Sequence, residues 1–167
     1  NGIGRATALA LAGEGAHVAL VDLDGDGLTS AAAEVAALGV DASTHVIDVA
    51  DGDAMALLVK DVVAELGVPT VVVNNAGIGM TGPFLDTTAA DWDRILGVNL
   101  RGVIHGSRLF AAEMVAAGLP GHIVNLSSGL AYAPARDMSA YVATKAAVLR
   151  LSEVLRTELG DHGIGVS

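Results

Sequence analysis

The sequence predicts a doubly wound α/β fold, in which a parallel sheet carries helices on both faces. Short apolar, β-branched runs alternate with longer Ala-rich stretches from one end of the chain to the other. Several of these runs end in an acidic or amide residue, and a Gly-x-Gly turn opens the first helical stretch. Such alternation is typical of a parallel sheet wrapped by helices. We expect residues 1–167 to form a single domain.

The composition excludes several functional classes. Lys+Arg minus Asp+Glu is 9 − 19 = −10 and there is no basic cluster, so we expect no nucleic-acid partner. The absence of Cys excludes disulfides and thiolate metal sites, and it fits a reducing cytoplasm. No apolar run has the length of a membrane span and no signal-peptide pattern is present, so we expect no membrane partner. The His residues lack the spacing of a metal site: His17, His45, His105, His122 and His162.

The chain opens with Asn1-Gly2-Ile3-Gly4, followed directly by an Ala- and Leu-rich stretch that predicts a helix. Glycine lets a backbone approach a pyrophosphate closely, and a helix N-terminus favours negative charge. Gly2, Ile3 and Gly4 are therefore candidates for binding a dinucleotide. A plain turn before a helix has the same composition, so this pattern alone leaves both alternatives open.

Residues 16–21 form an apolar run that predicts a buried strand, and Asp22 follows it directly. A carboxylate about 20 residues beyond a glycine turn can accept hydrogen bonds from a ribose 2′-OH and repel a 2′-phosphate. The alternative is an acidic residue that only ends the strand. Asp24 and Asp26 add negative charge nearby, and Arg5 opposes it. This balance favours NAD over NADP as the cofactor.

The next predicted helix covers residues 26–38, and the strand after it covers residues 43–47 and leads into Asp48-Val49. Asp51 has the position of an N-cap for a helix that runs to Leu66. We therefore expect the two acids to have different roles, with Asp48 facing a ligand and Asp51 capping the helix.

Residues 68–73 give the strongest strand prediction of the chain, and Asn74-Asn75-Ala76-Gly77 follows them. Small side chains at the end of a central strand allow a dinucleotide to lie against the backbone. An Asn-rich turn without a ligand is the alternative.

A polar loop over residues 79–90 precedes a long helix predicted from Trp92 to Ala117, with Asp91 as its N-cap. Asn99 lies inside this helix, where Asn is a mediocre helix former. A buried polar role is one interpretation of Asn99, and a solvated side chain is the other.

The strand predicted at residues 121–126 ends in Ser127-Ser128, and Tyr141 and Lys145 follow in a helical stretch. A spacing of four residues puts two side chains on one helix face, with their Cβ atoms roughly 5–6 Å apart. The ammonium of Lys145 would then lower the pKa of the Tyr141 phenol from about 10 toward neutrality. Ser128, at the carboxyl end of a strand, could donate a hydrogen bond to a substrate carbonyl oxygen.

The segment Ser127–Lys145, SSGLAYAPARDMSAYVATK, resembles the catalytic segment of the short-chain dehydrogenase/reductase family, which are single-domain NAD(P)-dependent oxidoreductases with a Ser–Tyr–Lys centre. Further matches follow the order of the family's motifs: the glycine turn at residues 2–4, Asp48-Val49, Asn74–Gly77 and Asn99. The family's glycine pattern starts a few residues earlier with a Thr-Gly that is absent here, so the match at the turn is partial.

The resemblance implies reversible hydride transfer between NAD(H) and a secondary alcohol or ketone. Ser128 would polarise the substrate oxygen, and Tyr141 would be the acid/base. Lys145 would lower the pKa of Tyr141 and bind the nicotinamide ribose, and Asn99 would complete a proton relay. The cofactor-binding residues that it implies are Gly2, Ile3, Gly4, Asp22, Asp48, Val49, Asn75, Ala76, Gly77, Tyr141 and Lys145.

Two other functions stay open. One is a dinucleotide-binding regulatory module without turnover, against which the intact Ser–Tyr–Lys set argues. The other is an inactive piece of the enzyme. Because the chain begins inside a glycine turn and stops where a strand begins at Ile164, we expect a fragment that lacks the first and the last strands. The missing first strand would lie between the strands that end at Asp22 and Asn74.

The helices predicted at residues 92–117 and 140–159 carry apolar residues on more than one face, and a sheet can cover only one of these faces. The resemblance implies dimers and tetramers, so we expect a homodimer or homotetramer built through these helices. The alternative is that other segments of the same subunit cover the apolar faces. We expect a mostly apolar substrate pocket, with internal packing as the alternative role of its candidate residues: Met80, Leu130, Tyr132, Pro134 and Met138.

Overall fold

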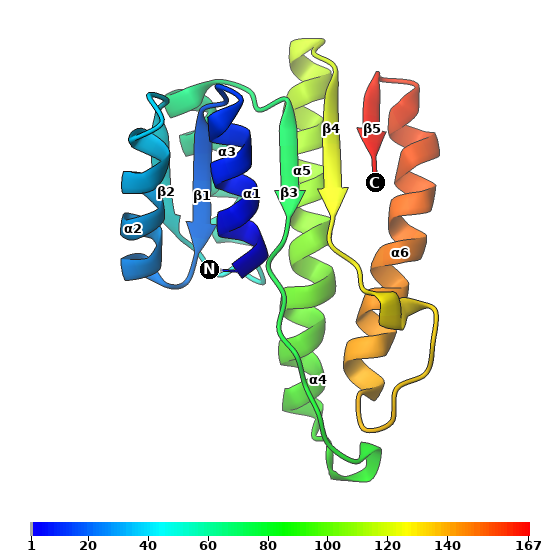
Figure 1. The fold of residues 1–167 in the computed structure, drawn as a ribbon. Helices are drawn as coiled ribbons and strands as arrows, with labels where there is room; N and C mark the ends of the chain where they lie inside the picture. The colour runs from blue at the N-terminus through cyan, green and yellow to red at the C-terminus, as the bar shows by residue number, and fades with distance from the viewer. Residues whose placement is uncertain (1) are drawn as a thin grey trace.

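Parallel strands and helices alternate through residues 2–167, the part of the chain that the computed structural model describes (Figure 1). One sheet pairs β1 (Val18–Asp22) with β2 (Ala42–Val46). The other holds β3 (Val71–Asn74), β4 (Gly121–Asn125) and β5 (Ile164–Val166) in that order. Every strand pair is parallel, which confirms the α/β fold predicted from the sequence.

The register places the carboxyl ends of neighbouring strands at the same level. Asp22 lies beside Val46, and Asn74 lies beside Asn125. All the arrows in Figure 1 run toward the same edge, and the connections after β3 and β4 and helix α4 (Ala89–Leu96) lie beyond it. Ligands of open parallel sheets bind outside this edge. The fold therefore places the candidate site there.

The sheet is interrupted between β1 and β3. Within residues 2–167 no strand lies between them, so their facing edges have no hydrogen-bonded neighbour. This gap is where the sequence predicts the missing central strand. Residues of both edges line one cavity of about 590 Å³, whose inner wall includes the apolar side chains of Met55, Leu58 and Phe110.

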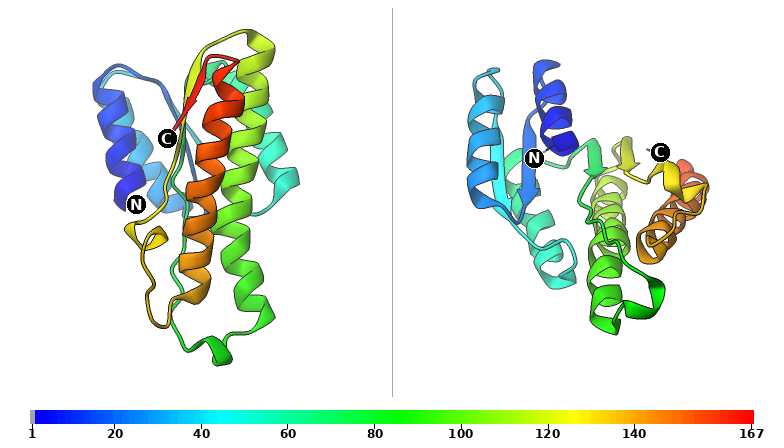
Figure 2. Two further views of the ribbon diagram at one scale, coloured as in Figure 1. Left: turned by 90° about the vertical axis from the view of Figure 1, so that its right-hand side faces the viewer. Right: turned by 60° about the horizontal axis from the view of Figure 1, so that its bottom comes forward.

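Helices cover both faces of the strands. Helices α1 (Gly2–Gly13) and α2 (Gly25–Ala36) lie on one face, and α3 (Gly52–Leu66), α5 (Gly102–Ala117) and α6 (Ser139–Gly160) lie on the other (Figure 2). None of the helices within residues 2–167 has the combination of length and apolarity that crossing a membrane requires.

Two hydrophobic cores hold these layers together. The larger core packs α3 and α5 against β3, β4 and β5 and includes the fully buried Met114 and Ile123. The smaller core packs α1 and α2 against β1 and includes Ala12 and Val35. Burying one such aliphatic side chain stabilises a fold by about 1.5–3 kcal/mol.

The helix N-termini show which acidic residues act as caps. Asp51 accepts hydrogen bonds from the backbone N–H of Asp53 and Ala54, as predicted for the N-cap of α3. The prediction that Asp91 is an N-cap is wrong, because α4 begins at Ala89 and Thr88 is the N-cap. Thr88 accepts from the backbone N–H of Asp91, and the Asp91 carboxylate accepts from that of Thr88. This reciprocal pair is a capping box.

The helix predicted over residues 92–117 is present within one uninterrupted helical segment that runs from Ala89 to Ala117. A π-helical turn, Gly97–Arg101, separates α4 from α5, and the sequence did not predict it. A Cβ atom on Gly102 would lie 2.7 Å from Cγ2 of Val49, and one on Gly97 would lie 3.2 Å from Cβ of Ala50. The glycines therefore let the turn pack closely against the connection that follows β2. Single π-helical turns are frequent at functional sites.

Candidate active site

Lys145 is a buried lysine in the second turn of α6. Its Nζ donates a hydrogen bond to the backbone oxygen of Leu126 at 2.7 Å and lies 5.9 Å from the centroid of the Tyr141 ring. Burial lowers the pKa of Lys145, because the ammonium loses solvation. The spacing of four residues thus brings a cation to the face of a half-buried phenol ring.

Asn99 is fully buried, which excludes the solvated interpretation of this residue. Its Oδ1 accepts from the N–H of Ile78 at 2.8 Å, and its Nδ2 donates to the Ile78 oxygen at 3.0 Å. Nδ2 also donates to the Thr144 hydroxyl at 3.2 Å, and that hydroxyl donates to the backbone carbonyl oxygen of Tyr141 at 2.8 Å. The Asn99 side chain therefore joins the connection after β3 to the helical turn that carries Tyr141 and Lys145.

The two serines after β4 make different contacts. Ser128 is the N-cap of a 3₁₀ turn, Gly129–Ala131, and its Oγ accepts from the N–H of Leu130 at 3.2 Å. That bond uses an oxygen lone pair, so the hydroxyl hydrogen is free to be donated to a ligand. The Ser127 hydroxyl instead donates to the backbone oxygen of Lys145 at 2.7 Å, which fastens the end of β4 to α6.

A buried polar network beneath the site was missed by the sequence analysis. Asn74 Nδ2 donates to Asn125 Oδ1 at 2.8 Å and to Ser107 Oγ at 3.1 Å, and Asn125 Nδ2 donates to Ser152 Oγ at 3.0 Å. These bonds join β3, β4, α5 and α6. The sequence does indicate such a network, because single polar residues stand in otherwise apolar strands and helices. A buried polar group in such a segment needs a hydrogen-bond partner.

The cavity between β1 and β3 brings together most of the predicted cofactor-binding residues. Seven of them line it: Gly4, Asp22, Asp48, Val49, Asn75, Ala76 and Gly77. Four predicted residues are not among its lining residues: Gly2, Ile3, Tyr141 and Lys145. The Ile3 side chain is exposed. Asn1, the first residue of the predicted glycine turn, lies outside the described residues.

Glycines at this cavity let the backbone approach neighbouring side chains closely. A Cβ atom on Gly4 would lie 2.7 Å from Nδ2 of Asn75, so a larger residue there would require the Asn75 side chain to move. A Cβ atom on Gly77 would lie 3.4 Å from Lys145 Nζ. The N-terminus of α1 favours the negative charge of a pyrophosphate beside this floor.

Asp22 is the last residue of β1 and also lines the cavity. Its Oδ1 accepts from the backbone N–H of Leu23 at 2.7 Å and of Asp24 at 3.2 Å. These bonds fix the carboxylate at the strand end. Within residues 2–167 there is no group of three or more His, Cys, Asp or Glu residues that could hold a metal ion.

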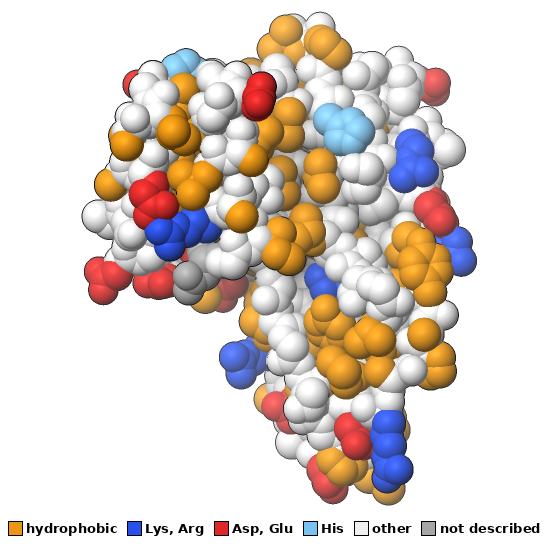
Figure 3. Space-filling view, in the orientation of Figure 1, with side chains coloured by type: hydrophobic (Ala, Val, Ile, Leu, Met, Phe, Trp, Pro, Cys, Tyr) orange, Lys and Arg blue, Asp and Glu red, His pale blue; other side chains and the backbone are white. Residues whose placement is uncertain are grey.

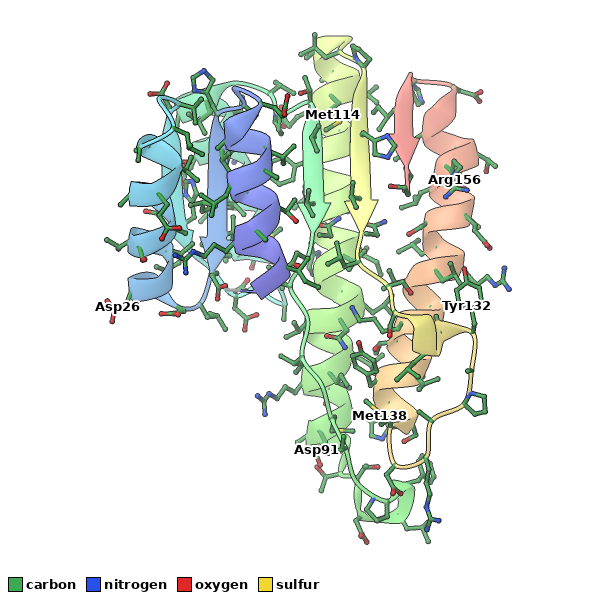
Figure 4. All side chains as sticks on the ribbon, viewed as in Figure 1. Asp26, Asp91, Met114, Tyr132, Met138 and Arg156 are labelled. Carbon is green, nitrogen blue, oxygen red and sulfur yellow. The ribbon has the colours of Figure 1, made fainter. Side chains whose placement is uncertain are left out.

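The candidate substrate residues lie near the start of α6. Figure 3 shows hydrophobic side chains gathered over this region, and Figure 4 labels Tyr132 and Met138 within it. The Tyr132 side chain is 76% exposed, so it is not part of the internal packing, whereas Met138 is half-buried.

The chain was compared with known proteins. The model of the family described as short chain dehydrogenase matches residues 1–167. "Probable oxidoreductase EphD" of Mycobacterium tuberculosis is 50% identical over 167 residues, which are all of this chain and 28% of that protein. The chain therefore spans only a part of that relative's length.

Solved structures give the same result. A metagenomic short-chain oxidoreductase in complex with NADP is 38% identical with a TM-score of 0.95, over 100% of this chain and 75% of that one. NAD⁺-bound xylitol dehydrogenase is 34% identical with a TM-score of 0.93, over 98% of this chain and 63% of that one. Because the family model matches residues 1–167, this chain belongs to the short-chain dehydrogenase/reductase family.

Proposed function

We propose that the protein containing this chain transfers a hydride between NAD(H) and a secondary alcohol or ketone. The observation that carries the proposal is the placement of Lys145 Nζ 5.9 Å from the centre of the Tyr141 ring, beside the cavity floor at Gly77. When bound, a nicotinamide cofactor supplies or accepts the hydride.

The residues of the chain handle the substrate oxygen and its proton. The Ser128 hydroxyl donates a hydrogen bond that polarises the oxygen, and the Tyr141 phenol gives the proton during reduction or takes it during oxidation. The ammonium of Lys145 stabilises negative charge on the phenol oxygen. Asn99 and Thr144 hold the helical turn that carries both groups.

The proposed preference for NAD rests on Asp22. Its fixed carboxylate can accept hydrogen bonds from a ribose 2′-OH, and it repels a 2′-phosphate. Of the two solved structures named above, one contains NAD⁺ and the other NADP, so the proposed preference of this protein rests on its own residues.

The test is a spectrophotometric assay of the full-length protein with NAD⁺ or NADH and a panel of secondary alcohols and ketones. Turnover of one substrate class with NAD(H) supports the proposal. Tight binding of NADH without turnover of any alcohol or ketone would favour a regulatory module instead.

The interrupted sheet favours a second candidate for residues 1–167 taken alone, namely an inactive piece of the enzyme. The facing edges of β1 and β3 leave backbone N–H and C=O groups without a strand partner, which destabilises a sheet. Residues 1–167 expressed alone should therefore melt at a lower temperature than the full-length protein and show no turnover.

The proposed assembly is a homodimer or homotetramer in which α5 and α6 pair with their symmetry mates. An apolar groove of about 620 Å³ runs between the two helices, and Ile104, Val115 and Leu155 are among its lining residues. Ile104 and Val115 are 38% and 40% exposed. Isologous pairing would remove these side chains from water.

A further inference from the structure

Arg5 is the only Lys or Arg among the residues that line the cavity between β1 and β3, as far as residues 2–167 are concerned. It lies in the first turn of α1, next to Gly4, whose backbone forms part of the cavity floor. A cation at this place is the group that a bound phosphate would use.

Arg5 is already paired with a carboxylate. Its Nε donates to Oε2 of Glu34 at 3.2 Å, and its Nη2 donates to Oε1 of the same residue. The guanidinium thus meets the Glu34 carboxylate through two parallel bonds, which is the strongest arrangement for this pair of groups. The side chains are 40% and 39% exposed, so water screens the pair only in part.

Arg5 and Asp22 line the same cavity. Arg5, Asp22, Leu23 and Gly27 all line it, and Glu34 reaches Arg5 from α2, the helix that follows Asp22 in the chain. NADP differs from NAD by a phosphate on the adenosine 2′-oxygen. Discrimination between them depends on the balance of carboxylates and free cations at that oxygen.

We propose that Glu34 is a second residue that determines cofactor specificity. Because Glu34 holds the Arg5 guanidinium in a bidentate ion pair, this cation does not bind a 2′-phosphate. Asp22 repels the phosphate directly, and Glu34 engages Arg5, the one Lys or Arg that lines the cavity within residues 2–167. This inference rests on the proposed function, because Asp22 lies next to the adenosine ribose only if a dinucleotide binds in this cavity.

The test compares Glu34→Gln with the unchanged full-length protein. Dissociation constants of NADH and NADPH are measured by the fluorescence of the bound reduced cofactors, which requires no turnover. A freed Arg5 should tighten NADPH binding by about tenfold, the effect of one hydrogen bond to a charged group, and should leave NADH binding within about twofold. The gain for NADPH should shrink as the salt concentration rises.

Asp26→Asn is the matched control. It removes the same charge from the same helix, but Asp26 is exposed in the first turn of α2 and points outward in Figure 4. Asp26 does not pair with Arg5, whose partner is Glu34, so the effect of Asp26→Asn reports only the general loss of negative charge. The NADPH gain of Glu34→Gln should exceed that of Asp26→Asn, and it should vanish in the double variant Arg5→Gln/Glu34→Gln.

Three outcomes would overturn the inference. These are an unchanged NADPH affinity in Glu34→Gln, an equal gain in Asp26→Asn, and weaker NADPH binding in Glu34→Gln, which would mean that Glu34 aims Arg5 at the phosphate. If the unchanged protein binds NADH and any of these results is obtained, the inference about Glu34 is contradicted but the proposed function is not. Failure of the unchanged protein to bind either cofactor would contradict the proposed function as well.

Discussion

Asn99 donates a hydrogen bond from its Nδ2 to the Thr144 hydroxyl at 3.2 Å, and both side chains are fully buried. Because the same hydroxyl donates to the backbone carbonyl oxygen of Tyr141, one series of hydrogen bonds connects the π-helical turn to the first turn of α6. Thr144 does not face the substrate in the proposed mechanism. It is a positioning residue for Tyr141 and Lys145.

Thr144→Val should lower the free energy of unfolding by about 1–3 kcal/mol, because Asn99 Nδ2 loses a buried acceptor. The variant should also lower kcat and move the pH profile of kcat, since the turn that holds Tyr141 and Lys145 can shift. Thr144→Ser keeps the hydroxyl and should restore both. Thr157→Val is the matched control, because Thr157 makes the same bond to the residue three positions earlier but is exposed. A pH profile that is identical in Thr144→Val would contradict the positioning role.

Tyr141→Phe removes the hydroxyl that the mechanism uses for proton transfer. The expected result is a loss of at least about a hundredfold in kcat, because general acid–base catalysis contributes about 10²–10⁴-fold. NADH binding should stay near that of the unchanged protein. Stopped-flow measurement of cofactor oxidation, with fluorescence titration of NADH, separates the two effects. Near-normal turnover would rule out Tyr141 as the acid/base.

Lys145→Met should change how stability depends on pH. Burial lowers the pKa of Lys145 in the folded protein below its usual value of 10.5. Between the two pKa values the unfolded chain binds more protons than the folded one, so this lysine makes the protein more stable as the pH rises. Below the folded-state pKa its burial destabilises the protein in full.

The measurement is urea unfolding of the unchanged protein and of Lys145→Met at several pH values from neutral to alkaline. The stability of Lys145→Met relative to the unchanged protein should fall as the pH rises through that window, while its catalytic activity is lost at every pH. Lys60→Met replaces the other lysine of the chain, which is exposed, and serves as the control. A constant difference between Lys145→Met and the unchanged protein would contradict the effect of burial.

Asp22→Ser should narrow the preference for NAD over NADP. The substitution removes the carboxylate that repels a 2′-phosphate, but Ser can still hydrogen-bond to a ribose hydroxyl. The ratio of kcat/KM for the two cofactors measures the effect. A higher kcat/KM with NADP in the unchanged protein would already show that Asp22 does not set the preference.

Val115→Glu should dissociate the proposed assembly, because it places a charge in the apolar groove between α5 and α6. Sedimentation velocity of the full-length protein at micromolar concentration measures the oligomeric state. Val46→Glu is the control, since Val46 is 61% exposed on β2 and lies outside the groove. If the unchanged full-length protein sediments as a monomer, the proposed assembly is wrong.

The sequence by itself determined the order of strands and helices and the chemistry at the strand ends. Apolar runs and helical periodicity are local properties, so they place β1 to β5 and the Asp51 cap without knowledge of the fold. The proximity of Tyr141 to Lys145 is also local, because four residues on a helix fix it. The gap between β1 and β3 follows from the order in which strands of this fold pair.

Only the tertiary structure decided which groups those side chains meet. Asn99 bonds to Ile78 and Thr144, which are 21 and 45 positions away, and Arg5 bonds to Glu34, 29 positions away. No spacing in the sequence encodes such contacts, because they depend on how α1, α2 and α6 pack on the strands. The capping box between Thr88 and Asp91 is different, because it joins residues three positions apart and is therefore local. The π-helical turn depends on packing, since its neighbour Gly102 lies against Val49.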